Sequence, residues 1–223
     1  MKRLSIFLVF VMLGTTGLVA QDKDQDRDQT RLMLVNGDVL QIRDRDQIRL
    51  QDKITLNDGT VVNPDGTYFT RDQVRLRLQD GSCLDMDGVL FRNEYQYRYK
   101  IQQENKGLTE TQVQNRNQNR YHIMNIDGEL YQIRNQYQNR LQQQLNLADG
   151  GTMNPDGTYQ SRDRKQMRLQ DGECLNLNGE KFTNTYQHRK MMVQKNKNMN
   201  KKKLMKKTPP KKMVSKKKKG ISS

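Results

Sequence analysis

The sequence predicts an all-β protein built from two tandem modules of antiparallel hairpins, and three observations lead to this prediction. The letters NPDGTY occur at residues 63–68 and again at 154–159. A shift of 91 positions superposes residues 33–98 on 124–189 without a gap. Within each copy, apolar residues spaced by two recur every 22 residues just before a turn dipeptide. Such alternation between glycine turns is typical of short, half-buried strands.

The first twenty residues are expected to be a secretory signal peptide. Lys2 and Arg3 precede the apolar run LSIFLVFVMLG, and TTGLVA ends in small residues, which predicts cleavage after Ala20. The apolar run is shorter than the roughly 20 residues that a membrane-spanning helix needs. We therefore expect an exported protein, periplasmic or extracellular, whose residues 21–31 form a polar leader.

Each module is expected to contain three units of about 22 residues. In module 1 (residues 32–99) the units align on Leu34, Leu56 and Leu78, which have partners in module 2 (residues 123–189). The first unit of each module lacks the second glycine of the pattern and has diverged most. The low apolar content, 33% with no Trp, predicts small cores.

Turn chemistry explains the repeated letters. In NPDG, Pro64 presets the backbone for the first corner, and Gly66 accepts the left-handed conformation that most residues avoid. Hairpin loops with a glycine bulge, and two-residue Asp-Gly or Asn-Gly corners, need this chemistry. We expect structural turns at Gly37, Gly59, Gly66, Gly81, Gly88, Gly128, Gly150, Gly157, Gly172 and Gly179.

Two segments outside the modules are polar. Residues 100–122 are rich in Gln and Asn, which predicts a linker with room for one short helix. Residues 190–223 contain 14 Lys and no Asp or Glu, which predicts a disordered tail. The net charge of +15 therefore belongs mainly to the tail, and the modules are close to neutral.

The stretches DGTVVNPDGT and LQDGSCLDMDG resemble a short exported domain common in Bacteroidota, domain of unknown function number 6799. The resemblance covers residues 33–91 and 124–182, and the elements GSCL and GECL strengthen it. It implies tandem copies and export, and no activity. The second copy has Asn176 and Asn178 where the first has Asp85 and Asp87, so a shared acidic ligand site is not indicated.

The two cysteines, Cys83 and Cys174, occupy equivalent positions. They are predicted to be small apolar strand residues; a disulfide between them, an intermolecular bond and a metal site remain alternatives. His122 and His188 have Arg31 and Tyr97 at the equivalent positions of the other copy. Because neither histidine is repeated, both are expected to be exposed and no catalytic pair is indicated.

No nucleophile elbow, phosphate-binding loop or zinc spacing occurs, so the protein is expected not to be an enzyme and to need no cofactor. Asp85 and Asp87 are weak candidates for a metal site. The basic tail indicates binding to an anionic envelope component, anionic lipid or nucleic acid. The lysines that would carry it are Lys201, Lys202, Lys203, Lys206, Lys207, Lys211, Lys212, Lys216, Lys217, Lys218 and Lys219. The alternative is a small-ligand, calcium or copper binding protein that uses the Asp-Gly turns or the cysteines.

Overall fold

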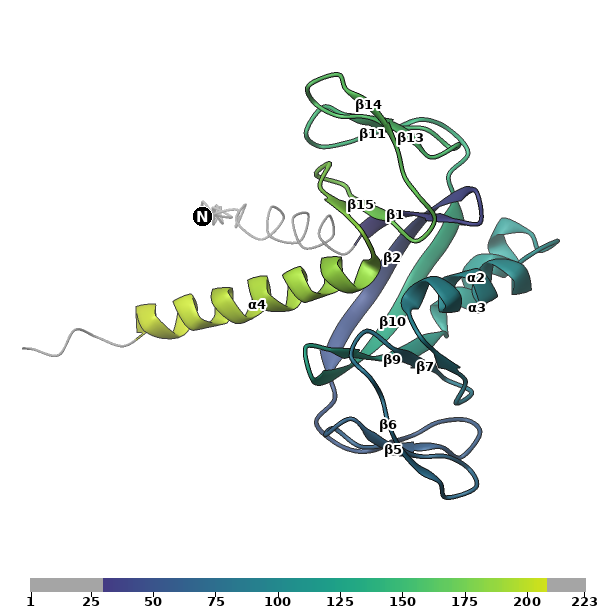
Figure 1. The fold of residues 1–223 in the computed structure, drawn as a ribbon, viewed down its shortest axis with the longest axis vertical. Coiled ribbons are helices and arrows are strands. Elements are labelled where there is room, and N and C mark those ends of the chain that lie inside the picture. Colours follow the sequence, from purple (N-terminus) through teal and green to yellow (C-terminus); the bar gives the residue numbers. More distant parts are fainter. Residues whose placement is uncertain (1–29, 208–223) are drawn as a thin grey trace, which may run out of the picture.

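The computed structural model describes residues 30–207, which form mainly antiparallel strands with three accompanying helices in that range (Figure 1). The predicted antiparallel hairpin architecture is confirmed. The predicted signal peptide, its cleavage site after Ala20 and most of the leader lie outside the described residues. Thr30 and Arg31 already belong to the first strand, so the leader is shorter than predicted.

Eight strands form a central sheet to which both modules contribute. The order is β16-β15-β1-β2-β10-β9-β7-β8. The first hairpin of each module pairs with the third unit of the other, β1 with β15 and β9 with β7, so the tandem copies are interleaved in space. The strands are β1 (Thr30–Val35), β2 (Asp38–Arg49), β7 (Cys83–Asp85), β8 (Leu90–Phe91), β9 (Tyr121–Ile126), β10 (Glu129–Arg140), β15 (Cys174–Asn176) and β16 (Lys181–Phe182).

A pseudo-twofold axis passes through the middle of this sheet. β2 and β10 pair there, and Asp44 lies opposite Asn135, its own counterpart 91 residues later. Asp44 stands where the second and third units have Gly66 and Gly88. Without a turn residue at this point the chain continues as a strand of 12 residues in each module. The divergent first unit therefore supplies the long strands that join the modules.

The middle unit of each module forms a separate small meander. The sheets lie at opposite ends of the long axis of the molecule (Figure 1). All ten glycines expected in turns have φ between +78° and +92°, the region that favours glycine. The strands are β3 (Ile54–Thr55), β4 (Val61–Val62), β5 (Thr67–Phe69) and β6 (Arg75–Arg77), and β11 (Leu145–Asn146), β12 (Thr152–Met153), β13 (Thr158–Gln160) and β14 (Gln166–Arg168).

Two helices correct the predicted linker at residues 100–122. α2 (Glu94–Glu104) begins in module 1, and α3 (Glu110–Gln118) follows after a short turn. Thr109 and Gln112 form a reciprocal capping box at the start of α3. Capping of this kind stabilises helices whose composition is otherwise polar. The Gln- and Asn-rich sequence therefore forms structure that connects the modules.

A third helix corrects the predicted tail. α4 (Thr185–Lys207) makes residues 190–207 helical, and residues 208–223 lie outside the described residues. Val193 is buried in the core, and Lys190 Nζ lies 2.7 Å from Asp127 Oδ1. These contacts anchor the first half of the helix, and Lys and Met are good helix formers. Within residues 30–207, no helix is both long enough and apolar enough to cross a membrane.

The hydrophobic core is shared between the modules. Four apolar clusters are present among the described residues, and each contains side chains from both modules. In one cluster Leu32 and Leu34 of module 1 pack with Met153 and Leu169 of module 2. Neither module alone contains a complete set of core neighbours, so the two fold around each other.

Candidate functional site

The lysines predicted to bind polyanions divide between α4 and the chain beyond it. Those in the last turns of α4 are Lys201, Lys202, Lys203, Lys206 and Lys207, and Lys211, Lys212, Lys216, Lys217, Lys218 and Lys219 fall outside the described residues. α4 leaves the body and projects well past the sheet (Figure 1). It contains nine basic residues and no Asp or Glu. The structure thus places a block of positive charge on a projecting helix.

The sequence candidates Asp85 and Asp87 act in a turn. Asp85 Oδ1 accepts hydrogen bonds from the backbone N–H groups of Asp87 (3.0 Å) and Val89 (2.9 Å). Asp85 Oδ2 accepts from Lys100 Nζ at 2.7 Å. In module 2 an amide oxygen of Asn176 accepts the equivalent backbone bonds, so the turn needs an acceptor and no charge. Among residues 30–207, no three His, Cys, Asp or Glu side chains are grouped to hold a metal ion.

Cys83 and Cys174 are free and buried. They lie on β7 and β15, which are five strand spacings apart in the central sheet, or about 24 Å at about 4.8 Å per spacing. A disulfide requires Cα atoms within about 7 Å, so the two thiols cannot bond within the chain. Burial raises the pKa of the Cys174 thiol to about 12 and raises that of Cys83 as well. Both pack as small apolar strand residues.

A buried ionic cluster lies where the modules meet, and sequence reasoning missed it. It consists of Arg31, Asp44, Glu94, Arg98 and Arg189, whose side chains are at most 6% exposed. Glu94 Oε1 accepts from Arg31 Nη2 at 2.5 Å and from Arg98 Nη2 at 2.8 Å. Glu94 Oε2 accepts from Arg189 Nε at 2.6 Å. Asp44 Oδ2 accepts from Arg31 Nη1 at 2.7 Å and lies 3.0 Å from Arg189 Nη1.

The two arginines of this cluster that come from helices are counterparts in the duplication. Arg98 on α2 donates to Asn135 Oδ1 at 2.9 Å, and Arg189 on α4 reaches Asp44 at 3.0 Å. Asn135 and Asp44 are themselves counterparts on β10 and β2. Each helix therefore reaches across the axis to the long strand of the other module. The repeated arginine at positions 98 and 189 is a signal of this contact that the sequence contains.

Both histidines are buried, which shows that the expectation of exposure was wrong. The ring of His122 lies 4.5 Å from that of Tyr97, and the ring of His188 meets Phe182 edge-on at 5.1 Å. Burial lowers the pKa of both, that of His188 to about 3, because the imidazolium would lose its hydration. Nearby arginines lower both pKa values further. The rings are neutral at pH 7 and serve as packing groups.

The ionic cluster holds permanent charges and offers no group suited to proton transfer. Burial by itself would raise the pKa values of Asp44 and Glu94, but Arg189, Arg31 and Arg98 outweigh it and hold both well below their ordinary range. General acid–base catalysis needs a pKa near the working pH. The cluster therefore acts as a polar joint between the modules.

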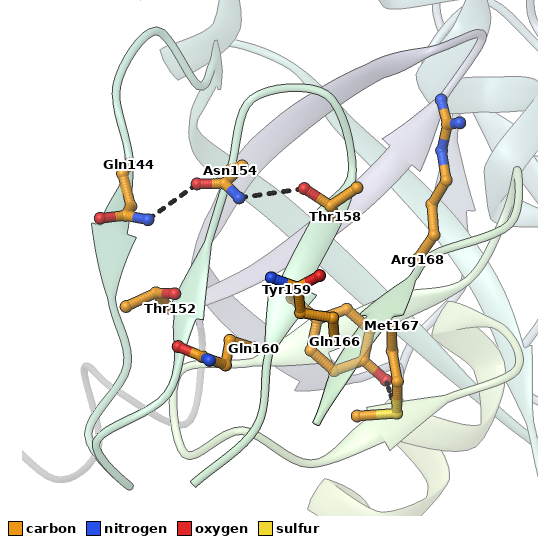
Figure 2. Close-up of a pocket in the computed structure, with 9 residues that line it drawn as sticks. All are labelled: Gln144, Thr152, Asn154, Thr158, Tyr159, Gln160, Gln166, Met167 and Arg168. Carbon is orange, nitrogen blue, oxygen red and sulfur yellow. Dashed lines mark hydrogen bonds between the residues drawn. The ribbon is translucent and has the colours of Figure 1, made fainter. Parts of the chain in front are cut away.

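A shallow hollow of about 440 Å³ lies on the small sheet β11–β14 (Figure 2). Gln144 Nε2 donates to Asn154 Oδ1 at 2.9 Å, and Asn154 Nδ2 donates to Thr158 Oγ1 at 3.0 Å. Arg168 carries the only charge in the lining. The lining residues are Gln144, Thr152, Asn154, Thr158, Tyr159, Gln160, Gln166, Met167 and Arg168.

The same positions of module 1 have a different chemistry. Val61 and Phe69 stand where the hollow has Thr152 and Gln160, whereas the Asn-to-Thr hydrogen bond of 3.0 Å is kept in both modules. The supporting bond is thus the same in both modules, while two side chains of the surface are apolar in module 1 and are a hydroxyl and an amide in module 2. The hollow can offer hydrogen bonds to a polar ligand.

Comparison with known proteins agrees with the duplicated architecture. The family model described as Domain of unknown function (DUF6799) matches residues 29–90 and 120–180, which together are more than half of the chain. No curated protein and no solved structure matches the chain. The predicted resemblance is confirmed for both segments. The chain therefore belongs to the family of domain of unknown function 6799, of which it carries two tandem copies.

Proposed function

We propose that the protein is an exported, non-catalytic interaction protein that attaches to anionic polymers or surfaces through α4 and the lysines that follow it. The observation that carries this proposal is the projection of α4 from a body whose own charge is nearly balanced. Of the nine basic residues of α4, Arg189, Lys190 and Lys197 pair with carboxylates of the body, and the helix carries no Asp or Glu of its own. The body holds the helix that carries this charge.

The contacts between α4 and the body begin near the start of the helix. Lys190 pairs with Asp127, and Lys197 Nζ lies 2.8 Å from Glu129 Oε2, so contacts with the body's acidic groups reach the middle of the helix. Residues 194–201 are exposed. The helix continues beyond these contacts to Lys207 (Figure 1), and we expect an external polyanion to bind its lysine-rich end.

The distribution of side chains favours binding by charge over insertion into a bilayer. Lys195 and Lys197 are two positions apart and so lie on opposite sides of the helix, with Met199 between lysine-bearing turns. A helix that lies in a membrane interface needs one continuous apolar face. Each lysine near an anionic surface contributes about 1 kcal/mol, and this attraction weakens as salt rises.

The test compares two full-length variants that lose equal charge. In the first, Lys201, Lys202, Lys203, Lys206, Lys207 and Lys211 become Gln; in the control, Lys53, Arg71, Arg75, Arg162, Arg164 and Lys165 become Gln. Binding is measured to duplex DNA, to heparin and to vesicles with and without phosphatidylglycerol, at low and high salt. We expect at least a tenfold loss for the helix variant and a much smaller loss for the control.

Equal losses in the two variants would contradict the proposal, because net charge alone would then explain binding. If the lysines are instead removed by truncating the C-terminal part of the chain, the truncation should start after residue 200. Removal from residue 190 onward would also remove Val193, which is buried in the core. Export is tested separately: the mature protein recovered from the producing cells should begin at Gln21.

A second candidate function is recognition of a neutral, hydroxyl-rich ligand by the hollow of Figure 2. It is favoured by the change from Val61 and Phe69 in module 1 to Thr152 and Gln160 in module 2. Side-chain amides and hydroxyls can each donate and accept hydrogen bonds. Titration with soluble neutral hexasaccharides should shift backbone NMR signals of β12 and β13, and the variant Thr152→Val/Gln160→Phe should abolish the shifts.

A further inference from the structure

Several of the contacts that build the body run between the modules. β1 pairs with β15, β2 with β10, and β9 with β7, so three of the joints in the central sheet cross from one module to the other. The four apolar clusters and the buried ionic cluster also draw on both modules. The modules are thus complementary partners in one structure.

A short turn decides which module a given module meets. α2 ends at Glu104 and α3 begins at Glu110, and the turn between them contains Gly107 with φ +78°. A Cβ at Gly107 would have no atom within 4 Å, so the turn is open to its surroundings at this residue. The other contacts between the modules do not depend on the chain being continuous there.

We propose that two copies of this chain associate by exchanging modules, so that module 1 of each chain is completed by module 2 of the other. Every strand pair, apolar cluster and ion pair described above is reproduced in such a dimer, and only the turn at Gly107 opens. Because each chain supplies one module of each kind, the assembly closes at two chains. Exchange of identical elements is a low-cost route to a dimer for this reason.

The order of synthesis creates the opportunity for exchange. Module 1 is made first, and β2 then has an unpaired edge of 12 residues until β10 has been made. Glu94 likewise cannot pair with Arg189 until module 2 has been made. An unpaired strand edge is a template for pairing with another chain. The partner that fits the edge of β2 is β10, from the same chain or from a second copy.

The test uses a disulfide across the exchanged interface, in a background in which Cys83 and Cys174 are replaced by Val so that the introduced cysteines have no other thiol to react with. Gln41 and Asn139 face each other in the β2–β10 pair. Opposed residues in antiparallel strands have Cα atoms about 4.5–5.5 Å apart, within disulfide range. Two differently tagged full-length variants, Gln41→Cys and Asn139→Cys, are unfolded and refolded together. We expect a disulfide-linked heterodimer whose yield rises with protein concentration.

Two controls define the result. Mixing the folded variants without unfolding should give little heterodimer. Pairing Gln41→Cys with Arg162→Cys, which is exposed in the turn between β13 and β14, reports random collision. A yield no higher than that of this control after co-refolding would overturn the proposal.

A variant with a shortened turn gives an independent measurement. Deletion of residues 106–108 prevents α3 from folding back beside α2 in the same chain, and we expect a dimer with a native far-ultraviolet circular dichroism spectrum. A monomer with that spectrum would also overturn the proposal. These measurements do not involve the charge of α4, so they stand apart from the test of polyanion binding.

Discussion

Glu94 is the residue on which the joint between the modules depends most. Three arginines from β1, α2 and α4 bind its carboxylate, although module 2 has Thr185 at the equivalent position. Arg31 and Arg189 are separated from it by 63 and 95 residues. The repeat pattern could not predict this contact, because the pattern compares equivalent positions and Glu94 is not repeated.

Replacement of Glu94 by Gln should lower the free energy of unfolding by about 3–5 kcal/mol, because three buried guanidiniums would face one remaining carboxylate. Urea unfolding measures the change. The matched control is Glu129→Gln, whose partners Arg49 and Lys197 are largely exposed, and it should cost less than about 1 kcal/mol. Equal costs would show that the cluster is not a major source of stability.

The buried histidines predict a loss of stability on mild acidification. Their pKa values are lowered in the folded protein from 6.5, so below pH 6.5 the unfolded chain binds protons that the folded protein does not. Stability should therefore be full above that pH and fall as pH decreases toward the folded pKa, which is about 3 for His188. The slope is at most about 1.4 kcal/mol per pH unit for each histidine. Urea midpoints between pH 7 and pH 5 test this, since Asp44 and Glu94 stay ionised there.

The variant His188→Tyr isolates one of the two histidines. Tyr97 occupies the equivalent position of module 1 and meets Phe91 edge-on as His188 meets Phe182. The tyrosine should fit, and the pH slope should fall by about half. A slope that does not change would assign the acid sensitivity to other groups.

At the scale of elements, the turns and the strands beside them were the most predictable part. Pro, Asp and Gly act through local backbone preferences, and the apolar positions Leu34, Leu56 and Leu78 are all buried. Leu76, which the same spacing predicts to be half-buried, is 42% exposed because the sheet β3–β6 is too small to be covered there. The sequence predicted room for one short helix in the linker and a disordered tail, whereas three helices form because caps and a few anchoring contacts outweigh the polar composition.

Substitutions at Gly66 and Gly88 allow the energetic cost of backbone strain to be measured apart from that of a steric collision. Both Gly66 and Gly88 have positive φ, but a Cβ at Gly66 has open space whereas one at Gly88 would collide with the carboxylate of Asp58. Gly66→Ala should cost about 1–2 kcal/mol, and Gly88→Ala about 1–3 kcal/mol more. Chemical denaturation of both variants tests the difference. Similar costs would mean that the Asp58 side chain moves aside freely.

At the scale of the whole molecule, the interleaving of the modules could not be predicted from the sequence. Repeat spacing shows which segments are alike, but the strands of both modules have equivalent faces, so it does not show which copy a hairpin pairs with. Neighbouring hairpins more often pair with each other than with a segment far along the chain. The long strands β2 and β10 arise from the missing second glycine; its absence is visible in the sequence, but the continuous strand that results was not predicted.

The shared core predicts that both modules unfold in one transition. Gly88→Ala in module 1 should lower the protection of amides in β13 of module 2 by the same free energy as that of amides in β5. Hydrogen exchange followed by mass spectrometry measures both segments in one experiment. Two separate transitions, or an effect confined to module 1, would contradict a single cooperative unit.

The meeting of Asp44 with Asn135 has a consequence for what a fused duplication permits. Two identical subunits would have to place the same residue on both sides of their symmetry axis, and a pair of aspartates there would repel each other. Once the halves share one chain, each side can change alone: Asp44 lies opposite an amide, and Glu94 binds three arginines although module 2 has no equivalent glutamate. Fusion of the two copies into one chain has allowed the two sides of the interface between the modules to differ.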